Sequence, residues 1–169
     1  MTVAARRSTA TDRWLSPAQE RVWRAWMAVT LRLDHEMNRQ LQEDSGLSIG
    51  DYHVLVALSG ADGHRLQLTA LAATIGWERS RLSHHLARMA ARDLVERRPS
   101  TRDRRATDAV LTPDGLRAVR AAAPRHADLV RRLVFDVLDE RDTDDLARAL
   151  GKVYGQLIKH GSIREPPRG

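Results

Sequence analysis

The sequence predicts a mainly α (α+β) fold, in which amphipathic helices accompany one small β-hairpin. Apolar residues recur at steps of three and four through most of the chain, which is the spacing of a buried helix face. Cap residues stand before several of these runs, and two short β-prone runs occur between residues 94 and 111. A chain of 169 residues suits one compact domain with appended helices.

A long first helix is expected to begin after Ser16. Ser16-Pro17 supplies an N-cap and a proline at the first helical position, and Gln19 is the capping-box partner. Ser45-Gly46 ends the helix. Between these points one apolar stripe runs through Val22, Trp26, Val29, Leu33, Met37 and Leu41. Its length exceeds what a small core requires.

Three shorter helices are expected between residues 48 and 91. Ser48 caps the first, which Ser59-Gly60 ends; its predicted buried positions are Tyr52, Leu55, Val56 and Leu58. A turn and a short strand over residues 61–66 lead to the second, ended by Gly76 and marked by Leu68, Leu71, Ala72 and Ile75. The third runs from about residue 78 to 91.

A hairpin and two further helices complete the prediction. The β-prone runs 94–98 and 106–111 flank a basic loop. Thr112-Pro113 opens a helix through Leu138, kinked at Pro124, and Asp139 begins the last helix. The stripe of the former is Leu116, Val119, Ala123, Leu129, Leu133 and Val137, and that of the latter is Leu146, Leu150, Val153 and Leu157.

The order of these elements is that of a winged helix-turn-helix, in which two short helices precede a hairpin and the second helix enters the DNA major groove. Placing Leu82, Leu86 and Met89 inward leaves small and hydrogen-bonding residues on the opposite face, which can approach base edges. That face comprises Ser80, His84, Ala87, Arg88 and Ala91, with Arg81 and Ser83 on its flanks.

Charge favours a polyanionic partner. The formal net charge is +6, and the isoelectric point is about 10.8. Nucleic acid or an anionic membrane surface could supply the counter-charge, and a codon bias towards arginine is the alternative explanation. Residues 77–105 hold nine arginines against four acidic residues, and so carry five of the six net charges. The positive charge is thus confined to the helix over about 78–91 and to the hairpin that follows it. This distribution favours a DNA-binding surface over a generally basic protein surface.

Several function classes lack their sequence signals. The chain has no cysteine, no secretory signal and no membrane-span candidate, so we expect a cytoplasmic protein without a membrane partner. No H-E-x-x-H pair, phosphate-cradling loop or nucleophile elbow is present, so we expect no enzyme, cofactor or metal. A metal-responsive regulator, a non-specific architectural DNA-binding protein and a winged helix used for protein contacts remain alternatives.

Three landmarks of the sequence, in this order, resemble the MarR (multiple antibiotic resistance regulator) family. They are Leu71-Ala72 with Gly76 and Ser80, then Leu94-Val95-Glu96-Arg97, then Asp103-Arg104-Arg105-Ala106 leading into Leu111-Thr112-Pro113-Asp114-Gly115. The resemblance implies a homodimer joined by N- and C-terminal helices, and repression of a palindromic operator that a small aromatic or phenolic ligand relieves. The spare apolar stripes of the terminal helices fit a dimerisation region.

The expected organisation follows from these predictions. Residues 1–15 form a disordered segment, and residues 161–169 a disordered tail. Residues 16–160 form the winged helix-turn-helix domain. Its DNA-binding lobe spans about 48–111, and its dimerisation helices span about 16–45 and 112–160.

The resemblance also implies roles for single residues. Ser80, Arg81, Ser83, His84 and Arg88 would face the major groove, and the wing tip around Arg102 and Arg104 the adjacent minor groove. Asp103 would orient Arg105. The predicted DNA-binding set is Arg79, Ser80, Arg81, Ser83, His84, Arg88, Arg97, Arg98, Arg102, Asp103, Arg104 and Arg105. His85 departs from the family, which usually has an apolar residue there, and is predicted to be a partly buried structural histidine.

A ligand cleft is the last prediction. Trp23 and Trp26 lie one turn apart, and together with Tyr52 they could line an aromatic cleft, or else serve core and dimer packing. His53 and His126 could bind a carboxylate or respond to pH, although His126 also fits a core position. The predicted ligand-binding set is Trp23, Trp26, Tyr52 and His53.

Overall fold

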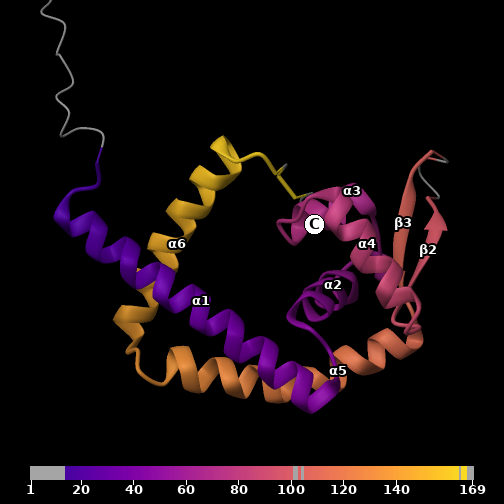
Figure 1. Ribbon diagram of the computed structural model, residues 1–169, viewed down its shortest axis with the longest axis horizontal. Helices are drawn as coiled ribbons and strands as arrows, with labels where there is room; N and C mark the ends of the chain where they lie inside the picture. The colour runs from indigo at the N-terminus through magenta and orange to yellow at the C-terminus, as the bar shows by residue number, and fades with distance from the viewer. Residues whose placement is uncertain (1–13, 101–102, 104, 164, 167–169) are drawn as a thin grey trace, which may run out of the picture. The chain divides into compact units, whose positions relative to one another are not determined.

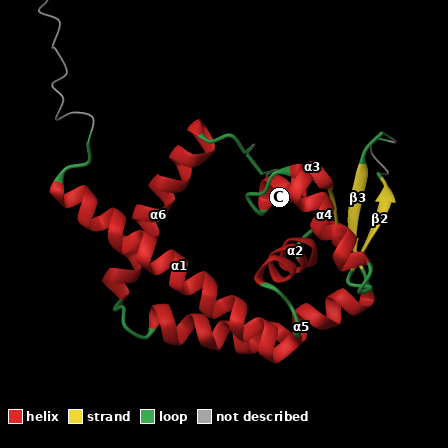
Figure 2. Ribbon diagram, viewed as in Figure 1, coloured by secondary structure: helices red, strands yellow, loops and turns green. Residues whose placement is uncertain are grey.

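The structure is a computed structural model that describes residues 14–100, 103, 105–163 and 165–166 (Figure 1). It comprises two units, residues 1–36 and 37–169. In chain order the elements are α1 (Pro17–Ser45), α2 (Ile49–Ser59), the 3₁₀ turn η2 (Asp62–His64), β1 (Arg65–Gln67), α3 (Leu68–Thr74), α4 (Arg79–Ala90), β2 (Val95–Pro99), β3 (Thr107–Leu111), α5 (Pro113–Val130), the π-helical turn η3 (Arg131–Phe135) and α6 (Glu140–His160). Helices dominate and one small sheet is present, which confirms the mainly α prediction (Figure 2).

Helix starts follow the capping chemistry read from the sequence. The side chains of Ser16, Ser48, Thr112 and Asp139 each accept the backbone N–H three residues further along, at 2.7 to 3.3 Å. Each bond satisfies a donor that the first turn of a helix leaves unpaired. The three predicted caps, Ser16, Ser48 and Thr112, are therefore confirmed, and Asp139, predicted only to begin the last helix, caps it.

The sheet has three antiparallel strands in the order β1-β3-β2. β2 and β3 form the predicted hairpin, with Arg97 opposite Ala109. β1 adds a third strand, with Leu66 opposite Ala109 on the other side. This pairing ties the segment before α3 to the hairpin, so the sheet and the helices α2, α3 and α4 form one lobe.

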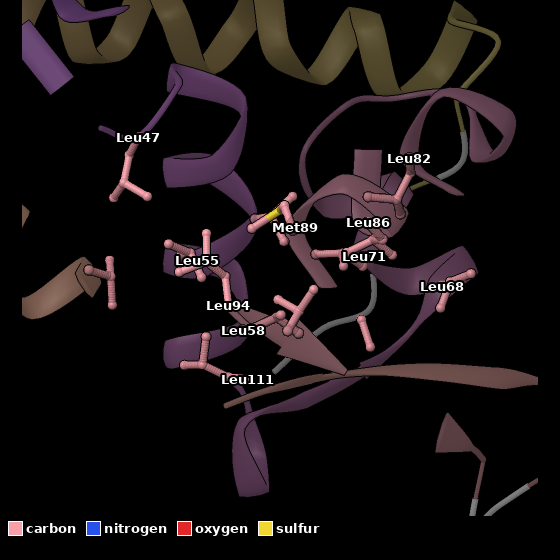
Figure 3. Close-up of a cluster of buried hydrophobic side chains, with 14 of the residues drawn as sticks. Leu47, Leu55, Leu58, Leu68, Leu71, Leu82, Leu86, Met89, Leu94 and Leu111 are labelled. Atoms are coloured by element: carbon pink, nitrogen blue, oxygen red, sulfur yellow. The ribbon is translucent and has the colours of Figure 1, made fainter. Parts of the chain in front are cut away.

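The core of this lobe consists of side chains from all its elements (Figure 3). Ala72 and Leu71 of α3 are buried, and Gly76 adopts a φ of +69°, a left-handed conformation that favours glycine. The predicted small residue and glycine turn between α3 and α4 are therefore both present. The largest fully buried side chains of the lobe are Leu47, Val54, Leu55, Leu58, Leu71, Leu82, Leu86, Met89 and Val95.

The predicted buried face of α2 is partly wrong. Leu55 and Leu58 are buried as expected, but Tyr52 is half-buried and Val56 is 44% exposed, while Val54 is fully buried. Apolar residues occur almost all round this helix, so their spacing alone does not select the inward side.

The C-terminal helices also differ from the prediction. α5 continues through Pro124 to Val130, and the regular helix then gives way to η3, so the predicted single helix through Leu138 is wrong. Leu133 and Val137 are 46% and 77% exposed. α6 has the predicted start but buries none of its residues within the chain.

Candidate nucleic-acid interface

The exposed side of α4 carries the residues predicted to read base edges. Leu82, Leu86 and Met89 are fully buried, which fixes the rotation of the helix. Arg79, Ser80, Arg81, His84, Ala87 and Arg88 are exposed, and Ser83 is half-buried. The inward and outward faces drawn from helical spacing are thus confirmed, whereas contact with DNA remains a prediction.

The hairpin adds a second row of basic residues. In β2, Val95 is buried while Arg97 and Arg98 are exposed. Arg98 pairs with Glu96, its Nε lying 2.6 Å from the carboxylate, so one acid partly offsets its charge. Arg102 and Arg104, predicted for the wing tip, lie outside the described residues.

The Asp103–Arg105 pair differs in detail from what the resemblance implied. The carboxylate of Asp103 accepts the backbone N–H of Arg105 at 2.9 Å. This bond organises the turn that leads into β3, and leaves the orientation of the guanidinium of Arg105 to other contacts.

A cavity of about 370 Å³ lies where α3, α4 and the hairpin meet. Its lining includes Arg79 and Ser83 from α4, Thr69 from α3, and Arg97 and Arg105 from the hairpin region. Arginine and hydroxyl side chains donate hydrogen bonds to phosphate oxygens, and guanidinium forks match phosphate geometry. The carboxylate of Asp103 also lines the cavity, so an anionic oxygen group would be held on the side of the cavity that the arginines line, between α4 and the hairpin.

A buried polar cluster lies under α4. The carboxylate of Asp51, only 4% exposed, lies 2.9 Å from Nε2 of His85 and 2.8 Å from a terminal nitrogen of Arg92. Burial would raise the pKa of Asp51, but the neighbouring His85 and hydrogen bonds from Ser48 and Arg92 outweigh it and hold this pKa well below its usual range.

His85 is buried, as predicted for a structural histidine, with 9% of its surface exposed. Its partners were not predicted from the sequence. Nδ1 lies 2.9 Å from a guanidinium nitrogen of Arg88, and the ring meets Trp77 edge-on at 5.1 Å between centroids. The guanidinium of Arg81 lies 4.1 Å above the Trp77 ring. Arg88 follows His85 by three residues and Arg81 follows Trp77 by four, which are the spacings of neighbours on a helix. This spacing could have indicated both pairs from the sequence.

A second cavity, also of about 370 Å³, lies between α2 and α3. Tyr52, His53 and Val56 line it from α2, and Thr74 and Ile75 from α3. Two of the four predicted ligand residues, Tyr52 and His53, therefore lie at one cavity. Trp23 and Trp26, 54% and 38% exposed, belong to the first unit, so the complete grouping stays a prediction.

His126 borders the second cavity through Tyr52. The two rings are 4.5 Å apart between centroids, and Nδ1 of His126 lies 3.3 Å from Oε1 of Gln40. Burial, and then the neighbouring His53, lower the pKa of His126, while burial raises the pKa of Tyr52. Both shifts favour neutral side chains around this cavity.

Across the described ranges, no group of three or more histidine, aspartate or glutamate side chains is arranged to hold a metal ion. Within the same part of the chain, no helix combines the length and the apolarity that a membrane crossing requires.

Comparison with known proteins gives consistent matches. A model of the MarR family matches residues 45–106. The HTH-type transcriptional repressor YetL of Bacillus subtilis (strain 168) is 26% identical over 129 residues, which cover 76% of either chain. The crystal structure of AbsC, a MarR family transcriptional regulator from Streptomyces coelicolor, is 37% identical, with a TM-score of 0.82 over 87% of this chain and 99% of that one. Sco3205, a MarR family transcriptional regulator from the same organism solved in complex with DNA, is 34% identical, with a TM-score of 0.83 over 91% and 95%.

Proposed function

The chain belongs to the MarR family of transcriptional regulators, and from that premise we propose that it is a repressor which binds a palindromic operator as a homodimer. The observation that carries the proposal is the outward face of α4. It combines arginines with small residues on a helix whose inward face is fixed by a packed core. The proposal includes no catalytic step, and it places the protein in the cytoplasm.

In this proposal α4 enters the major groove. Arg81, His84 and Arg88 reach for base edges, and Ser80 and Ala87 allow the helix backbone to come close. Arginine is suited to guanine because its two parallel N–H groups match the N7 and O6 acceptors. These side chains then supply sequence preference.

The hairpin and the first cavity contact the DNA backbone in this proposal. Arg97 and Arg105 lie beside Arg79 around a cavity of phosphate-binding character. Contacts to phosphates fix the register of a protein on the duplex and release counterions whatever the sequence. The minor-groove role predicted for Arg102 and Arg104, which lie outside the described residues, is part of the same proposal.

The homodimer is supported by apolar surface that the chain leaves exposed. Leu146, Leu150, Val153 and Leu157 follow one side of α6 and are 37% to 61% exposed. Large contiguous apolar patches on a soluble chain mark interaction surfaces, and a two-fold dimer buries the same patch on both subunits. In the first unit, Val22, Trp23 and Val29 are also more than half exposed. We assign both surfaces to the dimerisation region.

The second cavity is the proposed ligand site. An aromatic or phenolic molecule fits the ring of Tyr52, the imidazole of His53 and the apolar side chains around them. The cavity also touches Thr74 and Ile75, which end α3 just before the Gly76 turn. A ligand there changes operator affinity only if it binds the DNA-competent and the incompetent states differently.

The test is selection of bound sequences from random duplex DNA at near-physiological salt. A palindromic motif with half-sites one helical turn apart, about 34–36 Å, is the expected result. The recovered motif and a scrambled duplex are then compared at two salt concentrations. Steep salt dependence without enrichment indicates the non-specific architectural alternative, and absence of binding contradicts the proposal. Phenols and benzoates are then screened for release of the motif.

A further inference from the structure

Two exposed arginines of α4 are held by aromatic rings beneath them. Arg88 donates to Nδ1 of His85 at 2.9 Å, and the guanidinium of Arg81 lies 4.1 Å above the ring of Trp77. His85 is buried and Trp77 is half-buried. His85 is turned into the lobe, and Trp77 lies in the loop before α4 with part of its surface covered by the guanidinium of Arg81.

The chemistry of His85 fixes its protonation pattern. A guanidinium has donors and no acceptor, so Nδ1 must present its lone pair to Arg88. The ring proton of the neutral histidine then lies on Nε2, which is 2.9 Å from the carboxylate of Asp51 in a geometry that does not form a hydrogen bond. One tautomer thus suits both neighbours.

Asp51 provides a rigid anchor for this arrangement. It is the capping-box residue of α2, exchanging hydrogen bonds with Ser48 at 3.0 Å in both directions. Arg92 donates to the same carboxylate oxygen as the backbone N–H of Ser48, at 2.8 Å, and also to the carbonyl of Gly46 at 2.8 Å. The carboxylate is therefore fixed by the first turn of α2 and by Arg92, just past the end of α4, and the ring of His85 lies beside it.

The two rings are also packed against the backbone of α2. Trp77 and His85 meet edge-on, at an interplanar angle of 88°. A Cβ added at Gly50 would lie 2.9 Å from Cη2 of Trp77 and 3.1 Å from Cε1 of His85. The rings occupy the space that a side chain at Gly50 would need, so α2 limits their rotation.

We propose that His85 and Trp77 are positioning residues which hold Arg88 and Arg81 for base reading, and so determine operator specificity without touching DNA. The inference rests on the proposed function. A free arginine side chain samples many rotamers, and ordering it at an interface lowers affinity. An arginine that is already held in one direction loses less conformational entropy when it binds DNA. It also points to one base position in preference to its neighbours.

The experiment compares variants at position 85 on the selected operator. His85→Leu fills the buried site with an apolar side chain and removes the hydrogen-bond acceptor for Arg88. His85→Gln restores an amide oxygen that can accept from Arg88 and an amide N–H that can donate to Asp51. Met89→Leu is the matched control, because it changes a buried residue of the same helix with little change in volume. Thermal unfolding verifies that each variant folds.

We expect His85→Leu to weaken operator binding about 2- to 10-fold and to relax base preference at one position, with little change on scrambled duplex. Met89→Leu should bind as the wild type does, and His85→Gln should bind better than His85→Leu. In a double-mutant cycle, His85→Leu combined with Arg88→Ala should bind no worse than Arg88→Ala alone. A purely structural histidine would give additive losses.

A second variant keeps the test decisive if His85→Leu does not fold. Trp77→Leu removes the ring under Arg81 and should weaken operator binding. In the corresponding double-mutant cycle, Trp77→Leu combined with Arg81→Ala should bind the operator no worse than Arg81→Ala alone. Unchanged base preference in the folded variants, or losses additive with those of the arginines, would overturn the positioning role while leaving the repressor intact. A wild type that selects no motif would overturn the proposed function and this inference together.

Discussion

The DNA-binding lobe and α6 use similar apolar residues in opposite ways. In α4 the leucines at 82 and 86 are fully buried by their own chain, whereas in α6 those at 150 and 157 are 37% and 61% exposed. Both helices are amphipathic, so the difference lies in what covers the apolar face. The lobe buries its apolar residues within one chain, whereas the stripe of α6 stays uncovered by its own chain, and in the proposed homodimer a second copy would cover it. Substitutions in the lobe should therefore alter the folding equilibrium, and substitutions in the α6 stripe the dimerisation equilibrium.

The largest effect is expected from placing charge in the α6 stripe. Leu146→Asp with Leu150→Asp should convert the dimer to a monomer at micromolar concentration and remove high-affinity operator binding. Burial of one leucine contributes about 1.5–3 kcal/mol, and a two-fold interface counts each position twice. Sedimentation velocity measures the association state. Lys152→Glu, a charge change off the stripe, is the control; a persistent dimer in the double variant would place the interface elsewhere.

The next prediction compares how much a leucine in the core of the lobe and a leucine in α6 contribute to the free energy of unfolding. Leu86→Ala removes a fully buried side chain, and should lower the free energy of unfolding by about 2–5 kcal/mol. The same substitution at Leu157, made in the monomeric α6 variant, should change it by less than about 0.5 kcal/mol. Urea unfolding followed by circular dichroism measures both. Equal losses at the two positions would show that α6 packs onto its own lobe.

Within the lobe, substitutions on the outward face of α4 and in the hairpin should both lower DNA affinity, but only those on α4 should do so in a sequence-dependent way. Arg88→Ala should cost about 1–3 kcal/mol on the operator and relax preference at one base pair. Arg97→Ala should weaken operator and scrambled duplex alike and lower the salt dependence by about one counterion. Fluorescence anisotropy titrations at several salt concentrations resolve the two. If Arg88→Ala lowered the affinity for operator and for scrambled duplex equally, Arg88 would contact phosphates and not a base.

Prediction from the sequence succeeded where the determinants are local. The N-caps at Ser16, Ser48, Thr112 and Asp139 depend on residues three positions apart, and the two faces of α4 follow from helical spacing. The exposure of Val56 was not predicted, because α2 is apolar on nearly all sides. The π-helical turn at 131–135 was also missed, since no proline or glycine marks it.

The candidate site shows the same limit. The outward residues of α4 were predicted from spacing, but the anchor beneath them was not. Arg92 and Asp51 are 41 residues apart, and their hydrogen bond depends on how α2 and α4 pack. The separation between His85 and Asp51 is similarly long, so only the tertiary structure brings an acid, an imidazole and the reading arginine together.

The smallest effect compares a buried ion pair of the lobe with an exposed one of α6. Asp51 is held by His85, Ser48 and Arg92, and its pKa lies well below its usual range. A carboxylate with a lowered folded-state pKa stabilises the protein above the unfolded value of about 3.9, and this contribution is lost as the pH falls towards the folded value. Asp51→Asn should therefore destabilise by about 1 kcal/mol at pH 7, and the difference from wild type should shrink below about pH 4.

Asp145, paired with Arg148 on the surface of α6, is the matched control for Asp51. Both side chains of this pair are more than half exposed, so Asp145→Asn should change stability by no more than about 0.5 kcal/mol, and less in high salt. Urea unfolding at pH 7, 5 and 3.5 measures both variants. A constant, pH-independent loss for Asp51→Asn would mean that the carboxylate acts through shape and capping geometry, which the amide disturbs, and not through its charge.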